Sequence, residues 1–494
     1  MFFNTAFFKL YKTPLLLAFA SLLLYTSFAY DLVRTDYIKL VMLYVALFFL
    51  FYKLVQLLKG NIKFLTWLAF GFRAVFILAI PNLSQDFYRF IWDGRLLLEG
   101  FNPYLFTVES FIGNNEFPVA QAQELYNGMG ALNAGHYTNY PPINQLCFVI
   151  AGLFSGESIL GSVIVMRVLI IAADFGTLYF GKKLLEKLKI PTYHIFWYIL
   201  NPFIIIELTG NLHFEGVMIF FLIWSLYLLH IGKWQWAAVV LGLSVSVKLI
   251  PLIFLPLFWQ WFTKHNVIST AQIDEKSHSK NDEILKQVQH DEKKTPAFTG
   301  ITKLNSFYVI TSTTVILSFL PFYSSEFTTN YTETVALWFN NFEFNASLYY
   351  IARAIGYTFR GYNEIAVIGK ITPIIVILLV LIFTFFRKNK TTIQLITAML
   401  LVLSFYYFTA TTVHPWYIAT LLILSVFTKF KFPLVWSFVI ILSYLAYLNV
   451  DKSDKSENLW IIALEYIIVY SVFIWEVFLK EKKRRFKRNL PFNG

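Results

Sequence analysis

The stretch from Ser84 to Arg95 concentrates chemically useful groups in a chain that is otherwise strongly apolar. It holds two carboxylates, Asp86 and Asp93, and two guanidinium groups, Arg89 and Arg95, among several ring residues. A carboxylate beside aromatic rings suits general-base attack on a hydroxyl and the stacking of a sugar ring. Each acid could instead be structural, as a helix cap or as the salt-bridge partner of a neighbouring arginine.

Several further polar clusters interrupt the apolar sequence. Lys248 lies inside an apolar run, where a charged side chain is costly and by default functional, although near a helix end it can extend to the interface. Lys, Arg and His side chains supply charge-assisted hydrogen bonds to a phosphate. The other clusters are Tyr140-Pro141-Pro142, Asn201 to Glu215, Glu326 to Arg353 and His414 to Tyr417.

Two of these clusters have structural alternatives. His213 and Glu215 could simply form a polar turn between two helices. His414 and Trp416 could anchor an aromatic belt at a membrane boundary. Because no second His or Cys lies at ligand spacing, a zinc site is not predicted.

The composition predicts that helices in a membrane position these groups. Of 494 residues, 57% are hydrophobic and only 14% charged, far from the average of soluble domains. The net charge of +12 does not indicate nucleic-acid binding, because the basic residues lie mostly in short loops between apolar runs. We therefore expect an all-α polytopic membrane protein with one domain, 1-494, and about twelve transmembrane helices. The expected spans are 14-30, 38-58, 64-81, 160-181, 192-209, 214-231, 305-323, 364-386, 392-411, 414-428, 432-449 and 459-479.

Two apolar segments do not fit a single full span. Residues 234-261 contain Lys248, Pro251 and Pro256, which predicts two short helices that enter the membrane and return. Residues 142-157 are predicted to form an interfacial or re-entrant helix.

The distribution of Lys and Arg predicts the sidedness of the chain. Basic residues concentrate in alternate loops, which predicts that the N- and C-termini lie in the cytoplasm. The membrane is expected to be the inner (cytoplasmic) membrane of the cell. The loop 82-141 is then extracytoplasmic and carries interfacial helices, whereas 263-303 is expected to be a mobile cytoplasmic loop. With this orientation the polar clusters converge on one extracytoplasmic site.

The first cluster, together with Gly100-Phe101-Asn102-Pro103-Tyr104, resembles the first outer loop of GT-C membrane glycosyltransferases, particularly mannosyltransferases that use polyprenyl-phosphate sugars. Five further segments are similar to other landmarks of that family. They are Tyr140-Pro141-Pro142, Asn201-Pro202, His213-Phe214-Glu215-Gly216, Val247 to Pro251 and His414 to Tyr417. Many relatives carry paired acids in this signature, whereas here Ser84 and Gln85 precede Asp86. No metal and no other cofactor is therefore expected.

The resemblance implies transfer of a hexose, with mannose favoured, from a polyprenyl-phosphate donor to a glycan or lipid-linked acceptor, with inversion at the anomeric carbon. Asp86 would be the general base. Binding of the donor phosphate is expected from Lys248, Arg89, His213 and His414. Binding of the sugar or acceptor is expected from Asp93, Arg95, Tyr140, Glu215, Trp416 and Tyr417.

Two other functions would also need cationic and aromatic groups at a membrane boundary. A transporter or flippase of a lipid-linked sugar would spread these groups along a path between both faces, whereas here they crowd at one face. A glycan polymerase or ligase would share the topology and differ in its donor. Assays of transfer from defined donors separate the three.

Overall fold

The computed structural model describes residues 5-264, 296-340, 342-449 and 457-480 of the chain. Every regular element in this part of the chain is helical, and its one strand-like feature is an isolated bridge between Phe344 and Thr412. The expected all-α class is therefore confirmed for the described residues.

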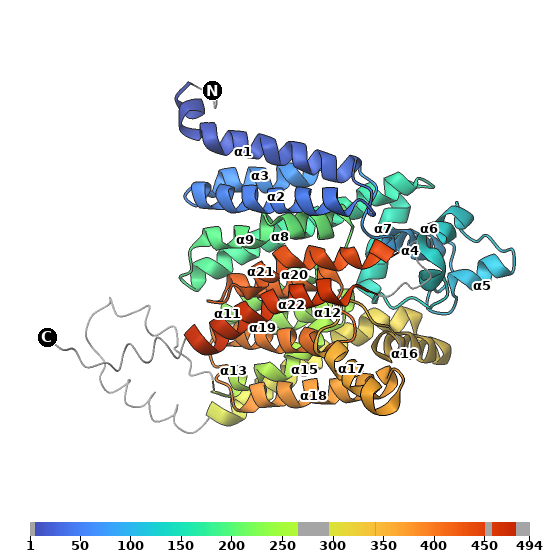
Figure 1. Cartoon of the computed structure of the whole chain (residues 1–494). Coiled ribbons are helices and arrows are strands. Elements are labelled where there is room, and N and C mark those ends of the chain that lie inside the picture. The colour runs from blue at the N-terminus through green and yellow to red at the C-terminus, as the bar shows by residue number, and fades with distance from the viewer. Residues whose placement is uncertain (1–4, 265–295, 341, 450–456, 481–494) are drawn as a thin grey trace.

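Seven helices are long and apolar enough to cross a membrane, or eight if one bent pair counts as a single span. Long runs of apolar residues produce these helices, and Pro14 and Pro373 are accommodated inside α1 and α18. They lie side by side as a bundle (Figure 1). They are α1 (Thr5–Tyr30), α2 (Tyr37–Leu58), α8 (Ile159–Lys187), α15 (Pro296–Phe319), α18 (Ile365–Phe385), α19 (Thr392–Thr409) and α22 (Leu459–Ile474), which Trp475–Leu479 extends.

The other five expected spans are short or broken, so a total of about twelve is not confirmed. Proline lacks the N–H that a helix interior needs but fits the first turn of a new helix, and Pro202, Pro415 and Pro433 each lie at such a start. The short elements are α3 (Ile62–Val75), α9 (Phe196–Ile199), α10 (Pro202–Ile204) with a π-helical turn (Ile205–Gly210), α11 (Glu215–His230), α20 (Ile418–Val426) and α21 (Phe432–Val439).

The segment around Lys248 forms a hairpin of short helices, as its prolines suggest. α12 (Trp234–Val247) ends at Lys248, whose backbone is extended, and a 3-10 segment (Ile250–Leu257) leads into α13 (Phe258–Lys264). The rings of Trp234 and Phe262 lie 6.3 Å apart, so the two arms start and finish at the same end of the bundle. Lys248 is consequently at the tip of the hairpin.

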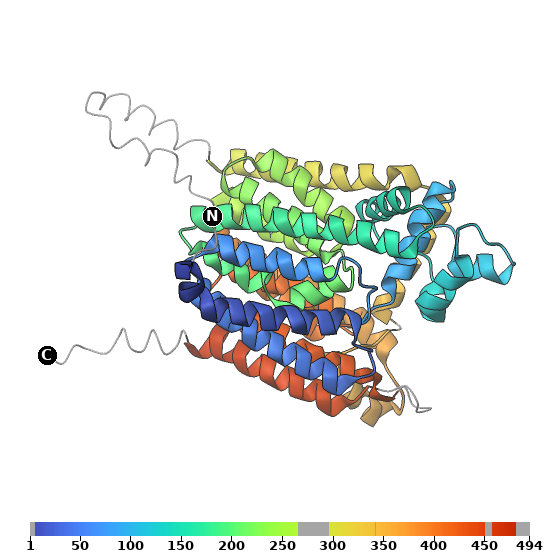
Figure 2. The same ribbon diagram turned by 90° about the horizontal axis from the view of Figure 1, so that it is seen from above.

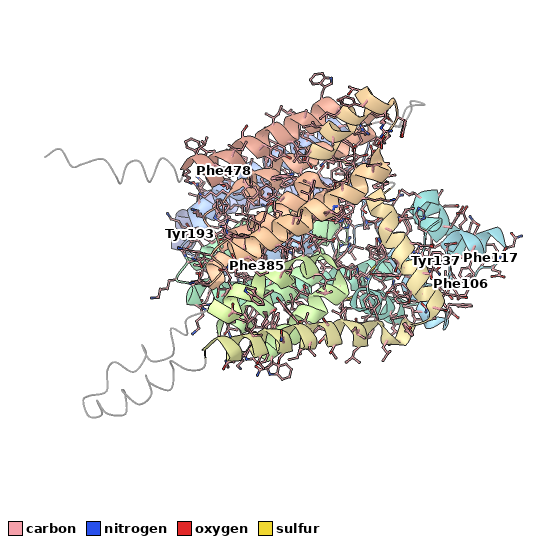
Figure 3. The ribbon with its side chains drawn as sticks, turned by 90° about the horizontal axis from the view of Figure 1, so that it is seen from below. Phe106, Phe117, Tyr137, Tyr193, Phe385 and Phe478 are labelled. Carbon is pink, nitrogen blue, oxygen red and sulfur yellow. The ribbon has the colours of Figure 1, made fainter. Side chains whose placement is uncertain are left out.

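Short helices cover one end of the bundle. The segment 82-141 folds into α4 (Asp86–Leu98), α5 (Val108–Gly113) and α6 (Ala122–Ala134), and α7 (Pro142–Ser155) follows. With α16 (Ser325–Asn340) and α17 (Leu348–Arg360) they lie at the end opposite the start of α1 and the end of α22 (Figures 1 and 2). Partly or fully exposed aromatic side chains occur at both ends, with Phe106, Phe117 and Tyr137 at the covered end and Tyr193, Phe385 and Phe478 at the other (Figure 3).

The expected cytoplasmic loop 263-303 lies largely outside the described residues, which resume at Pro296. α13 continues to Lys264 and α15 begins at Pro296. Residues 296-303 are thus helical, which corrects the expectation that the loop extends to 303.

Candidate functional site

A pocket of about 430 Å³ opens where the covering helices meet the bundle. The start of α4, the start of α11, the Lys248 hairpin and the segment before α20 all contribute to its wall. The predicted residues Asp86, Tyr140, Glu215, Lys248, His414, Trp416 and Tyr417 line it together.

Asp86 is the first residue of α4 and faces this pocket. The Asn133 side-chain amide donates to its Oδ1 over 3.2 Å, which fixes the direction of the carboxylate. Burial raises the pKa of Asp86, and the Asn133 hydrogen bond and the charge of Lys248 only partly offset this effect. The carboxyl group thus has a geometry and a proton affinity suited to a general base.

Arg89 and Asp93 do not reach the pocket, contrary to the expectation of donor and acceptor binding. Arg89 Nε donates to Asp93 Oδ1 at 2.7 Å, and the other Asp93 oxygen accepts from Gln145 Nε2 at 3.1 Å. Arg89 also donates to the backbone carbonyls of Asn133 and His136. The pair therefore supports the backbone of Asn133, whose side chain orients Asp86.

Arg95 is also a structural residue of the covering helices. Its guanidinium donates to the Ala120 carbonyl at 2.7 Å and to Gln121 Oε1 at 3.3 Å, away from the pocket lining. Next to it, a Cβ on Gly94 would lie 2.3 Å from the Phe148 carbonyl oxygen. This contact shows how closely α4 packs on α7.

Lys248 and Glu215 form the charged centre of the pocket. Lys248 Nζ lies 3.0 Å from Glu215 Oε1 and 5.3 Å from the centre of the Tyr140 ring. The Glu215 side chain is 5% exposed and that of Lys248 is 25% exposed. The lysine therefore neutralises the buried acid and still presents part of its ammonium group to the pocket.

Four rings stack in a column along the pocket wall. His213 covers one face of Trp416 at 3.6 Å between ring centres, and His414 covers the other at 4.6 Å. Phe344 then stacks on His414 at 5.1 Å. Because both faces of Trp416 are covered, only its edge can meet a ligand, which does not fit the expected stacking of a sugar on this ring.

His213 lies behind the pocket wall instead of in it. Its side chain is 2% exposed, and its Nε2 lies 3.9 Å from Glu207 Oε2. Glu207 in turn accepts from the Tyr444 hydroxyl, and Tyr444 lines the pocket. His213 therefore supports the pocket through its stacking on Trp416. Its position does not support the direct phosphate contact that the sequence led us to expect.

Arg167 stabilises the break in the chain that delivers Glu215 to the pocket. Its guanidinium donates to the carbonyls of Thr209 and Gly210, where the π-helical turn ends, and to that of Ile77. The helix pair on either side of this break is bent by 116°. A buried arginine thus satisfies carbonyl groups that a continuous helix would have satisfied itself.

Sequence reasoning missed several residues of the pocket. Arg34, in the connection between α1 and α2, lines it, as do Tyr407 and Tyr444. The sequence could have indicated Arg34, because the predicted topology places its loop on the same side of the membrane as Asp86. Asn133 carried no such signal, since its hydrogen bond to Asp86 depends on the packing of α6 against α4.

An apolar helical bundle with a carboxylate, a lysine and an aromatic wall at one covered end fits a membrane glycosyltransferase, and the family comparison shows that class. Residues 17–263, half of the chain, match the family described as alpha-(1->6)-mannopyranosyltransferase, N-terminal domain. The chain belongs to this family. No curated protein matches the chain.

Proposed function

We propose that this mannosyltransferase moves mannose from a polyprenyl-phosphate donor to a hydroxyl of a glycan or lipid-linked acceptor. Asp86 removes the proton of the acceptor hydroxyl as its oxygen attacks the anomeric carbon from the side opposite the phosphate, which inverts that centre. The observation that carries the proposal is the placement of Asp86, oriented by Asn133, in one pocket with Lys248 and His414.

Lys248 is the proposed partner of the departing phosphate. Negative charge grows on the phosphate oxygens as the glycosidic bond breaks, and a partly desolvated ammonium group stabilises it. Arg34 and the ring edge of His414 line the same pocket and are proposed to assist. Tyr140, Tyr417 and Tyr407 offer the aromatic surfaces for the sugar and the acceptor.

The site is proposed to face the extracytoplasmic side of a cytoplasmic membrane, with both termini in the cytoplasm. The turn between α2 and α3 and the end of α8 lie at the bundle end away from the pocket (Figure 1). These segments carry Lys59, Lys63, Lys182 and Lys183. Short loops rich in lysine favour the cytoplasm, which supports this orientation.

The direct test is a transfer assay with the purified protein and synthetic polyprenyl-phosphate mannose or glucose, against a panel of glycan and glycolipid acceptors. We expect transfer of mannose, and a product of anomeric configuration opposite to that of the donor. Absence of transfer from every such donor would overturn the proposal. Movement of the lipid across a vesicle membrane without transfer would favour the flippase alternative.

The pH dependence of transfer tests Asp86 without altering the protein. The carboxyl must be ionised to accept a proton, and burial raises its pKa, so activity is lost as pH falls through that raised pKa. We expect the acidic limb of the kcat/KM profile to lie above about 3.9, the ordinary value for aspartate. A limb at or below the ordinary value would count against Asp86 as the base.

Transfer is also expected to continue in excess EDTA. The reason is the position of Lys248, whose ammonium group is 3.0 Å from Glu215 and already balances the charge of that acid. Initial rates with EDTA and with added Mg²⁺ or Mn²⁺ should agree within about twofold. Loss of activity in EDTA that Mn²⁺ restores would show that a metal is required.

A further inference from the structure

The segment 342-347 forms the back of the pocket wall beside His414. The Phe344 N–H donates to the Thr411 carbonyl at 3.1 Å, and the Val413 N–H donates to the Phe344 carbonyl at 2.8 Å. These bonds make the isolated bridge between Phe344 and Thr412. Since the Phe344 ring also stacks on His414, this segment sets the position of the His414 loop.

Asn345 holds that segment in an unfavourable backbone conformation. Its φ is 46°, in the left-handed region that non-glycine residues rarely adopt. The residue is fully buried, and it makes three hydrogen bonds to residues from the C-terminal part of the chain. Its N–H donates to Glu457 Oε1 at 2.8 Å, its side-chain amide donates to Glu465 Oε1 at 3.3 Å, and its carbonyl accepts from the Tyr466 hydroxyl at 2.7 Å.

Glu465 is the buried centre of this arrangement. It lies in α22, is fully buried, and does not line the pocket. Its Oε1 also accepts from Trp436 Nε1 at 3.0 Å, which ties α21 to the same point. Burial of a carboxylate among apolar helices costs free energy of folding. We therefore expect Glu465 to have a role that an apolar residue could not fill.

We propose that Glu465 and Asn345 are positioning residues of the transferase, which act through the Phe344–Thr412 bridge to hold His414 at the pocket. This inference rests on the proposed function and on the part that His414 has in it. Removal of the Glu465 oxygen takes away the acceptor of the Asn345 side-chain amide and weakens the support of its left-handed conformation, so that the His414 loop shifts. The effect therefore falls on turnover, and binding of the donor through Lys248 remains.

A double-mutant cycle with His414→Ala tests the proposal. Glu465→Leu is expected to lower kcat about tenfold with little change in the donor KM, and to have almost no further effect in the His414→Ala background. Glu465→Gln keeps an oxygen that accepts both bonds and should restore kcat to within about twofold of the wild type. Additive effects of Glu465→Leu and His414→Ala would overturn the proposal.

Glu476 provides a matched control at the other end of the same helical segment. It is also buried, and its Oε2 accepts from the N–H groups of Lys431 and Phe432, neither of which lines the pocket. Glu476→Leu should lower thermal stability but combine additively with His414→Ala. Equal coupling of both acids to His414 would show that Glu465→Leu merely loosens the fold.

A disulfide-trapping measurement tests this inference independently of the proposed function, because it does not require transferase activity. Cysteines at Phe344 and Thr412, in a Cys147→Ser background, occupy facing positions of the bridge and should cross-link readily under mild oxidation. Glu465→Leu is expected to slow this cross-linking, and Glu465→Gln and Glu476→Leu to leave it unchanged. An unchanged cross-linking rate in Glu465→Leu would overturn the inference even if mannosyl transfer is confirmed. If the wild type transfers no mannose but Glu465→Leu still slows the cross-linking, only the proposed function is refuted.

Discussion

Asp86→Asn is expected to lower the rate of mannosyl transfer by about 10²- to 10⁴-fold, the usual contribution of a positioned general base. The amide keeps the shape of the carboxyl group and can still accept from Asn133, so the pocket should retain its form. Burial raises the pKa of Asp86, so folding favours its neutral form and the ionised carboxylate costs stability at pH values above that pKa. The variant should therefore unfold at the same temperature as the wild type or at a higher one at neutral pH.

The combination of lost activity and retained stability separates catalysis from a structural role. Glu116→Gln, an exposed acid of the same covering segment, is the matched control and should leave both kcat and Tm unchanged. Transfer by Asp86→Asn at the wild-type rate would eliminate Asp86 as the base. A drop in Tm together with lost activity would indicate that the carboxylate supports α4.

Lys248→Met is expected to lower kcat/KM for the polyprenyl-phosphate donor by about 10²- to 10³-fold, as removal of one charge-stabilising donor does in other enzymes. The same change leaves the buried Glu215 carboxylate without its partner, so Tm should fall as well. The two effects have different causes, and a second substitution separates them.

The double variant Lys248→Met/Glu215→Gln removes the unpaired buried charge. We expect its Tm to recover toward that of the wild type while transfer stays low, because the phosphate still lacks its cation. Lys248→Arg keeps the charge and should retain more activity than Lys248→Met. Recovery of transfer in the double variant would mean that Lys248 serves only to neutralise Glu215.

The long helices of this fold could be predicted because each contains a long apolar run, as in α2. The broken elements could not be predicted, because composition alone does not show where the bundle can supply hydrogen-bond partners to the backbone groups of a helix end. The span expected at 192-209 illustrates this limit. Pro202 starts a new helix there, and Arg167 in α8 binds the carbonyls of Thr209 and Gly210 at its end.

Within the site, residue type and predicted sidedness brought Asp86 and Lys248 to the same place. For Arg89 the structure shows the alternative that the sequence also allowed, a salt bridge to Asp93 four positions along the same helix, and Gln145 from α7 completes that pair. The covering of both faces of Trp416 was also not predictable. One covering ring, His213, is about 200 positions away in sequence, and only the packing of the bundle makes them neighbours.

The hairpin of α12 and α13 places the chemistry of Lys248 at one end and the connection to α15 at the other. Lys248 is at its tip by the pocket, whereas the end of α13 and the start of α15 meet at its open end, where a Cβ on Gly300 would lie 2.7 Å from the Phe262 carbonyl oxygen. Because these two helix ends already touch, the peptide joining Lys264 to Pro296 closes a loop whose entropy cost grows only slowly with length. Insertions and deletions there, including an inserted affinity tag, can accumulate without displacing the lysine at the pocket.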